Sequence, residues 1–158
     1  MRPAVAADTE AVAAIYNQGI EERSSTFETE PRETADVHAW LMAGERLPLL
    51  VADEGGRVLG WARMLAYSER AAYAGVGEVS VYVGAAARGR GLGRALLNAL
   101  EQQARELDYW KLVGNLFADN AASARLVKSC GWREVGLHLR HGRLDGEWRD
   151  VLLVERVF

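Results

Sequence analysis

The 158-residue sequence has one cysteine, three prolines and a formal net charge of only −3. A single cysteine cannot form a disulfide within the chain, and a chain of this length can hold an apolar core without a metal ion. The longest apolar run, Leu47 to Ala52, is far shorter than the ~20 residues of a membrane-spanning helix. The sequence also shows no secretory signal. We therefore expect a cytoplasmic protein that has no membrane partner.

Positive charge is also in short supply, because 22 acidic residues face 19 lysines and arginines. This balance excludes a basic surface along the whole chain of the kind that binds nucleic acid, although it permits a local basic patch. The positions of the arginines therefore matter more than their number.

Apolar periodicity divides the chain into elements in the order α, α, β, β, β, α, β, α, β, β. We expect helices over residues 8–20, 31–41, 92–107 and 120–130, and strands over 47–52, 58–66, 78–83, 110–117, 132–139 and 148–157. Asp145-Gly146 is typical of a hairpin turn between the last two strands. The strand, helix, strand sequence in the middle implies a parallel pair. The prediction is one domain over residues 1–158, of α/β (α+β) class, with a mixed, mostly antiparallel sheet around a central parallel pair flanked by helices.

The strongest chemical signal is the segment 83–94, VGAAARGRGLGR, between a predicted strand and the long predicted helix. Its glycines let backbone N–H groups approach a ligand closely, and a helix N-terminus adds an electropositive end. Arg88, Arg90 and Arg94 add three positive charges to a chain that is negative overall. The segment therefore predicts a site for linked phosphates, with a solvated glycine-rich loop as the alternative.

Two other phosphate motifs do not fit this segment. A P-loop needs Gly-Lys-Ser/Thr at the start of the helix, where this chain has Gly93-Arg94-Ala95. A dinucleotide fingerprint needs a glycine where Arg94 or Leu96 stands, depending on the register. The sequence thus excludes the first motif and disfavours the second.

The pattern Arg-x-x-Gly-x-Gly at Arg88, Gly91 and Gly93 resembles the acyl-coenzyme A pyrophosphate loop of the GCN5-related N-acetyltransferase (GNAT) superfamily. The helix Asn-x-x-Ser at Asn120 and Ser123, which ends in a glycine and an aromatic residue, resembles the second cofactor motif of that superfamily. Further segments resemble its phosphinothricin acetyltransferase branch, namely Ile15–Asn17, Thr26–Pro31, Arg70–Tyr73 and Glu78–Tyr82. The likeness covers nearly the whole chain.

This resemblance implies an acetyl-coenzyme A-dependent N-acetyltransferase that acts on a small amino-acid-like amine of the phosphinothricin or methionine sulfoximine type. It also implies a homodimer, and it implies neither a metal cofactor nor a nucleic-acid partner. The alternatives are a protein or peptide N-acetyltransferase and a non-catalytic acyl-coenzyme A-binding module. The expected cofactor-binding residues are Val81, Tyr82, Val83, Arg88, Gly89, Arg90, Gly91, Leu92, Gly93, Arg94, Asn120 and Ser123. Asn120 also suits an N-cap, and the two roles are compatible.

Acetyl transfer requires a neutral amine, and an amine with a pKa of ~10.4 is only on the order of 10⁻³ neutral at pH 7. Glu78 matches the position of the general base in the family, where it can act through a bound water, and the alternative is a solvent-facing strand residue. Val127 stands where relatives carry Tyr or His, so no general acid is assigned. A thiolate with a pKa of ~8.5 can leave without one.

Phe27, Arg70 and Tyr73 match positions near the acceptor pocket of the branch, where Arg70 can pair with a carboxylate or phosphinate or remain a surface arginine. Three other features favour structural roles. Trp40, Trp61 and Cys130 are expected to be core residues. His138 and His141 are three apart on a strand and should point to opposite faces, so a shared metal ion is not expected.

Overall fold

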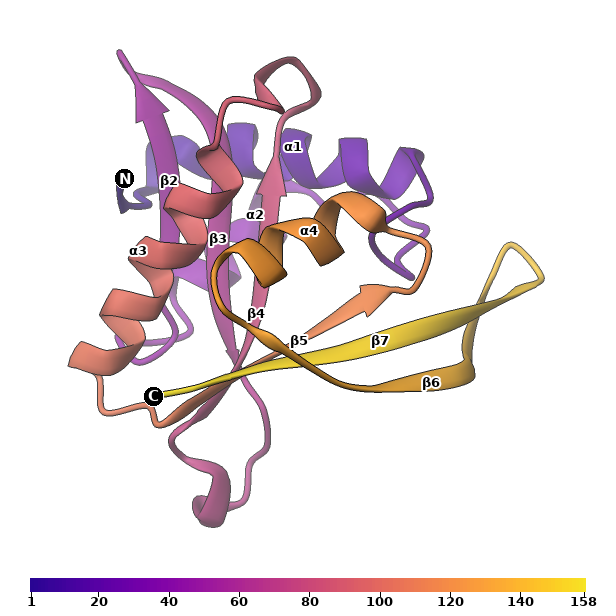
Figure 1. The fold of residues 1–158 in the computed structure, drawn as a ribbon. Helices are drawn as coiled ribbons and strands as arrows, with labels where there is room; N and C mark the ends of the chain where they lie inside the picture. Colours follow the sequence, from indigo (N-terminus) through magenta and orange to yellow (C-terminus); the bar gives the residue numbers. More distant parts are fainter.

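The computed structural model describes all 158 residues and contains one seven-stranded sheet, in the order β1-β2-β3-β4-β5-β7-β6. The strands are β1 (Arg2–Pro3), β2 (Leu49–Glu54), β3 (Arg57–Ala66), β4 (Val76–Val83), β5 (Lys111–Phe117), β6 (Arg133–Leu144) and β7 (Glu147–Val157). Only β4 and β5 are parallel, and every other pair is antiparallel. This confirms the predicted mixed sheet with a central parallel pair (Figure 1).

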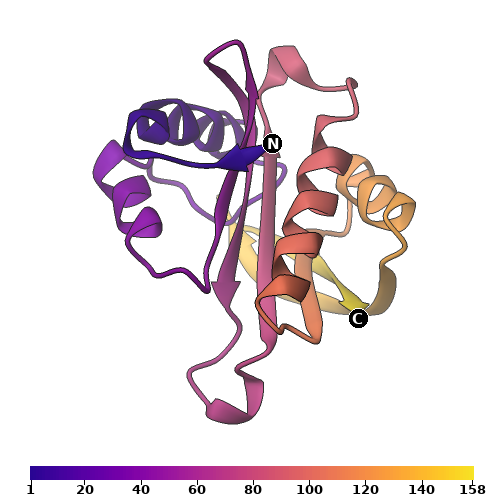
Figure 2. The ribbon, with the colours of Figure 1, turned by 90° about the vertical axis from the view of Figure 1, so that its left-hand side faces the viewer.

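Four α-helices flank the sheet, with α1 and α2 on one face and α3 and α4 on the other (Figure 2). Their bounds are α1 (Thr9–Glu21), α2 (Thr34–Leu41), α3 (Leu92–Glu106) and α4 (Ala121–Ser129), and three short 3₁₀ turns lie at Ala6–Asp8, Ala71–Tyr73 and Ala85–Ala87. We call the two faces the α1/α2 face and the α3/α4 face. None of the helices is both long and apolar enough to cross a lipid bilayer.

Each face of the sheet has its own apolar cluster. The leucine stripe of α3 repeats at helical spacing and buries Leu96 and Leu100 completely against the sheet. On the α1/α2 face, Val12 and Val37 pack around Trp61, which is 1% exposed. The predicted core position of Trp61 is therefore confirmed.

The last hairpin differs in part from the expectation. Its turn at Asp145-Gly146 has φ values of 50° and 85°, which confirms the predicted hairpin turn. However, β6 does not end at residue 139 as expected but continues to Leu144. Its register with β7 shifts between His138 and Gly142, around Arg140, whose φ is 49°.

This bulge brings two side chains together that the simple strand pattern separates. The rings of His138 and His141 stack with centroids 4.6 Å apart, so the expectation of opposite faces is wrong. The extra residues of the bulge break the alternation on which that expectation rests. No group of three or more His, Cys, Asp or Glu side chains is arranged to hold a metal ion.

The parallel pairing of β4 and β5 is short. It consists of Val76 with Lys111, Gly77 with Leu112 and Glu78 with Val113, although both strands continue for several residues. Beyond Glu78 the strands diverge, because β5 stays paired with β7 along its whole length (Figure 1). We call the space between the diverging strands the wedge.

A charged contact holds the N-terminal strand to the helix that follows it. Two Arg2 nitrogens donate to Asp8 at 2.7 and 2.9 Å, and the Val5 amide donates to the same buried carboxylate at 2.8 Å. Arg2 also donates to Asp53 of β2 at 2.8 Å. The hydrogen bonds from Arg2 hold the pKa of Asp8 below its usual value.

We predict that Asp8→Asn lowers the free energy of unfolding at pH 7 by about 1 to 2 kcal/mol, because charge-assisted hydrogen bonds are lost. The lowered pKa means that Asp8 stabilises the wild type above its usual pKa and that this contribution disappears as the pH falls through the folded-state value. Urea unfolding from pH 7 to 3 should therefore show the two proteins converging below about pH 4. Asp108→Asn, at an exposed position, is the control. A constant difference across the pH range would contradict the assignment.

Candidate active site

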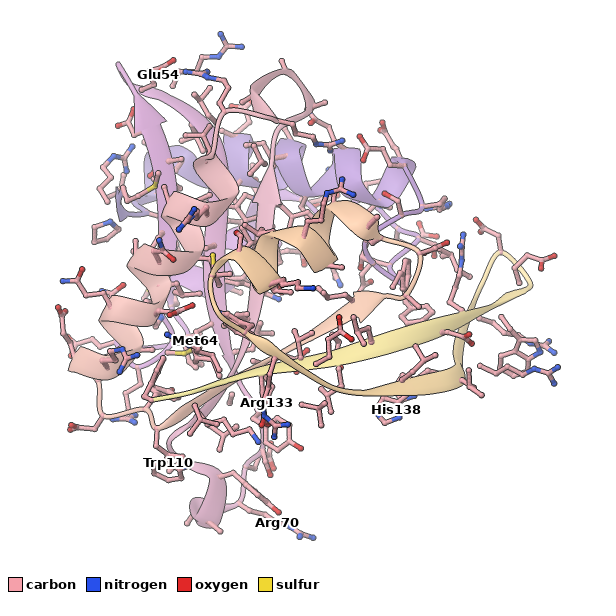
Figure 3. The ribbon with its side chains drawn as sticks, in the orientation of Figure 1. Glu54, Met64, Arg70, Trp110, Arg133 and His138 are labelled. Atoms are coloured by element: carbon pink, nitrogen blue, oxygen red, sulfur yellow. The ribbon has the colours of Figure 1, made fainter.

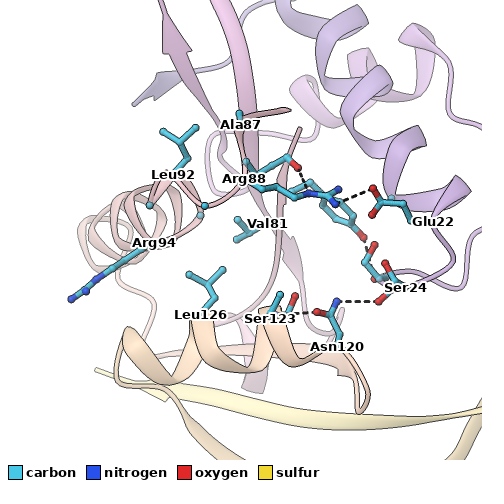
Figure 4. Close-up of a pocket in the computed structure, with 18 residues that line it drawn as sticks. Glu22, Ser24, Val81, Ala87, Arg88, Leu92, Arg94, Asn120, Ser123 and Leu126 are labelled. Atoms are coloured by element: carbon cyan, nitrogen blue, oxygen red, sulfur yellow. Dashed lines mark hydrogen bonds and ion pairs between the residues drawn. The ribbon is translucent and has the colours of Figure 1, made fainter. Parts of the chain in front are cut away.

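A cavity of about 370 Å³ lies where the N-terminus of α3, the end of β4 and the start of α4 meet (Figure 4). Its wall also includes residues at and just after the end of α1. Eleven of the predicted cofactor-binding residues line it, namely Val81, Tyr82, Val83, Arg88, Gly89, Gly91, Leu92, Gly93, Arg94, Asn120 and Ser123. The structure thus brings three separate parts of the sequence together around one space. Only Arg90 of the predicted set is not in the lining.

The glycines before α3 are needed for backbone conformation rather than for space. Gly89 and Gly91 have φ values of 75° and 78°, which side-chain-bearing residues rarely adopt, and a Cβ at either position would contact nothing within 4 Å. The chain can therefore turn sharply into α3, and the first amides of α3 have no partner within the helix. This is the arrangement that binds phosphate at a helix N-terminus.

The three arginines of this segment take different directions. Arg88 forms an ion pair with Glu22 at 2.9 Å and donates to the Val83 carbonyl at 3.1 Å. Arg90 instead forms an ion pair with Glu54 of β2 at 2.6 Å. Arg94 extends away from Arg88 along the outside of α3 (Figure 4). Arg88 is therefore the arginine best placed to meet a phosphate group.

Asn120 connects α4 to the segment after α1. Its side-chain oxygen accepts from the Ser123 amide at 3.0 Å, which confirms the predicted N-cap, and its nitrogen donates to the Ser24 carbonyl at 3.0 Å. Residues after α1, such as Ser24 and Glu22, line the cavity but were not predicted to do so. Their polar loop carries no motif, and only the fold brings it to the site.

A second, smaller space of about 50 Å³ lies in the wedge. Val79 of β4 and Gly114 and Leu116 of β5 form two of its sides, and α4 closes it with the buried Val127. It shares Val81, Ser123 and Leu126 with the larger cavity. The wedge is therefore apolar on the α3/α4 side, and Val127 supplies no proton donor there.

Glu78 is the last residue of β4 that pairs with β5, so it lies at the apex of the wedge. It shares the α1/α2 face with Ser80 and Tyr82 because strand residues alternate. Its half-buried carboxylate accepts a hydrogen bond from Asn115 of β5 at 3.2 Å. The carboxylate is thus placed between the two diverging strands.

Tyr82, four residues further along β4 on the same face, is held by two contacts. Its ring stacks on Trp61 with centroids 4.8 Å apart, and its hydroxyl donates to the Ser25 carbonyl at 3.3 Å. Burial raises the pKa of Tyr82 well above its usual value, so its hydroxyl stays protonated at neutral pH.

The structure does not bring the three predicted acceptor residues together. Phe27 packs edge-on against Phe117 of β5, with centroids 4.7 Å apart. Arg70 and Tyr73 are exposed on the loop between β3 and β4, which projects beyond the end of the sheet (Figure 3). None of the three lines the 370 Å³ cavity. Their part in substrate binding stays a prediction.

The sequence matches the family model described as "Acetyltransferase (GNAT) family" over residues 13–132. The chain belongs to the GNAT family. It is an N-acetyltransferase that uses acetyl-coenzyme A, and the predicted resemblance to this family is confirmed.

Curated relatives fall in the predicted branch of the GNAT family. The phosphinothricin N-acetyltransferase of Streptomyces coelicolor is 33% identical over 99% of this chain and 94% of the relative. The L-methionine sulfoximine/L-methionine sulfone acetyltransferase of Pseudomonas paraeruginosa is 34% identical over 98% of this chain and 92% of the relative.

Solved structures of GNAT proteins share the whole fold. A phosphinothricin acetyltransferase from Sinorhizobium meliloti, in complex with acetyl-coenzyme A, has a TM-score of 0.92 at 31% identity over 99% of this chain and 86% of that one. A ribosomal-protein-alanine N-acetyltransferase from Brucella melitensis has a TM-score of 0.95 at 34% identity over 99% and 98%. The names of these two proteins point to different classes of acceptor.

We predict that Asn120→Ala lowers the free energy of unfolding by about 0.5 to 2 kcal/mol, because α4 loses its N-cap. Asn120→Asp keeps an oxygen for the Ser123 amide but loses the donor to Ser24, so it should be clearly less destabilising. Urea unfolding of both variants at pH 7 makes the comparison. Equal destabilisation would show that the bond to Ser24, and not the cap, is the important contact.

Proposed function

We propose that this GNAT enzyme acetylates the amine of a small amino-acid-like substrate, of the phosphinothricin or methionine sulfoximine type, by direct attack in a ternary complex. The observation that carries the proposal is the position of the Glu78 carboxylate, at the apex of a wedge that adjoins the cavity at the N-terminus of α3. The names of the curated relatives support this class of substrate.

The cavity has the features that coenzyme A requires. The backbone amides of residues 89–93 and the Arg88 guanidinium would hold the pyrophosphate, because both present N–H donors at an electropositive helix end. The pantetheine arm would contact the unpaired edge of β4 at Val81 and Val83, with Asn120 and Ser123 on the opposite wall. Acetyl-coenzyme A supplies the activated acetyl group when bound.

Glu78 would act as the general base. At neutral pH it would remove a proton from the substrate ammonium group, directly or through a water, and so produce the neutral amine that attacks. Since Val127 offers no proton, the departing thiolate would take, through water, the proton that the amine nitrogen loses as the amide bond forms and the thioester bond breaks. The apolar wedge would keep the acetyl group apart from bulk solvent.

A protein or peptide N-acetyltransferase is the second candidate. It is favoured by one observation, the name of the Brucella melitensis protein, whose fold this chain matches over 99% of its length. A non-catalytic acyl-coenzyme A-binding module is the third reading, and it rests on the missing proton donor at Val127.

We further propose a cytoplasmic homodimer. The exposed apolar side chains of the β6–β7 hairpin support it, because Val135, Leu137, Leu139 and Trp148 are each between 44% and 71% exposed.

We predict that Arg88→Gln weakens coenzyme A binding by about tenfold to a hundredfold, because a charge-assisted contact to phosphate is lost. Arg90→Gln is the matched control, since it removes the same charge from the same segment but from a side chain bound to Glu54. Its affinity should stay within about threefold of the wild type. Isothermal titration calorimetry with coenzyme A measures both. A larger loss for Arg90→Gln would contradict the assignment.

We predict that Glu78→Gln lowers kcat by about 10²- to 10⁴-fold, because the base is lost, while calorimetric coenzyme A affinity is unchanged. Thiol release from acetyl-coenzyme A is measured with amino acids, their sulfoximine and phosphinate analogues, and peptides. Glu134→Gln, on the exposed strand β6, is the control.

Three outcomes of this assay separate the candidates. Turnover with single amino acids supports the proposed function, and turnover with peptides alone supports the second candidate. Coenzyme A binding without thiol release from any amine supports the non-catalytic module. An unchanged kcat in Glu78→Gln across the pH range rules out Glu78 as the base.

A further inference from the structure

A cavity of about 380 Å³ on the α1/α2 face lies apart from the cofactor cavity and shares no lining residue with it. Arg63 of β3 is its only polar lining residue. The other eight are Ala39, Trp40 and Ala43 from α2 and its C-terminal end, Leu47 and Leu49 from around the start of β2, and Met64, Leu65 and Ala66 from β3. The volume lies in the range of small-molecule sites.

Arg63 has a cationic group without a counter-ion. It takes part in none of the ion pairs of the structure, and its Nε atom is buried without a hydrogen-bond partner. Its guanidinium lies over the Trp40 ring, 3.8 Å from the centroid, which holds it in place. Burial is the main cause that lowers the pKa of Arg63, while Tyr16, Tyr82 and Glu78 act in the opposite direction. A cation without an ion-pair partner in a partly dry site favours an anionic ligand.

Arg63 is also close to the proposed base. It pairs with Ser80 across β3 and β4, so Glu78 is its diagonal neighbour on the same face, at about 7 to 8 Å between backbones. Leu65, which lines the cavity, pairs directly with Glu78. A ligand whose amine meets Glu78 can therefore reach both Arg63 and the apolar cavity.

We propose that Arg63 binds the carboxylate of the acceptor and that the adjoining cavity takes its side chain, so that the preferred acceptors are α-amino acids with a free carboxylate. This inference rests on the proposed function and narrows its substrate class. In an α-amino acid the amine and the carboxylate are attached to one carbon, which suits a head group held between Glu78 and Arg63.

Arg70 is the competing anion site, because the sequence predicts it to pair with a substrate carboxylate. It is exposed, and it lines none of the cavities described above. A half-buried guanidinium attracts a carboxylate more strongly than an exposed one, since water screens the latter. The two arginines therefore make different predictions for the same assay.

The test compares L-phenylalanine with L-phenylalaninamide, which lacks only the anionic charge. In wild-type enzyme kcat/KM should be at least tenfold higher for the acid. Arg63→Gln should abolish this preference by raising the KM for the acid about tenfold or more, with kcat for the amide within about threefold of the wild type. Arg63→Lys should retain part of the preference, because the positive charge remains.

Arg105→Gln is the matched control. Arg105 also stacks its guanidinium on an aromatic ring, 4.0 Å from the centroid of Phe158, but it lies near the end of α3 and lines neither cavity. This variant should keep the wild-type preference. Arg70→Gln should keep it as well.

Several results would overturn the inference. These are an unchanged preference in Arg63→Gln, or a loss of preference in Arg70→Gln instead. If Arg63→Gln does not fold, the wild-type enzyme alone provides the test. A ratio near one between kcat/KM for phenylalanine and kcat/KM for its amide rejects the inference.

Binding separates this inference from the proposed function. Calorimetry of the wild-type enzyme with coenzyme A present should show tighter binding of phenylalanine than of its amide, whether or not thiol is released. Absence of thiol release with every amine rejects the proposed function, while equal affinity for the acid and the amide rejects the role of Arg63.

Discussion

The divergence of β4 from β5 after Glu78 is the constraint on which the rest of the site depends. It arises because β5 is paired along its whole length with β7 and follows the C-terminal hairpin, while β4 stays paired with β3. The divergence leaves one edge of β4 without a neighbouring strand and opens an apolar space beneath α4. The carboxylate of Glu78 lies at the last paired position, where the two strands begin to diverge.

The electrostatics of the site follow from where each charge finds its partner. Arg88, Arg90 and Arg94 are close together in the sequence, but they do not act as one group. Arg90 forms an ion pair with Glu54 of β2, whereas Arg88 forms an ion pair with Glu22 in the wall of the cavity. The glycine turn adds the free amides of a helix N-terminus at the same place. On the other face, Arg63 forms no ion pair, and its Nε atom is buried without a hydrogen-bond partner. The molecule therefore has two separate cationic regions, which we propose bind the nucleotide and the acceptor.

Local sequence patterns predicted most of the fold and the residues that line the cofactor cavity. The leucine stripe of α3, the alternation in β4 and the two cofactor motifs depend on short stretches of sequence, so they were visible without the structure. Contacts between residues far apart in the sequence could not be predicted in this way. The stacking of His138 on His141 depends on a bulge, and the pairing of Arg90 with Glu54 joins residues 36 apart. The sequence did not point to Arg63, because its lack of an ion-pair partner depends on how α2 packs against β3.

The most direct test of this account is a crystal structure of the enzyme with acetyl-coenzyme A. The account predicts the pyrophosphate against the amides of residues 89–93, and the thioester inside the wedge between β4 and β5, on the edge next to Glu78. A ligand bound elsewhere, or a wedge closed by continued pairing of β4 with β5, would contradict it.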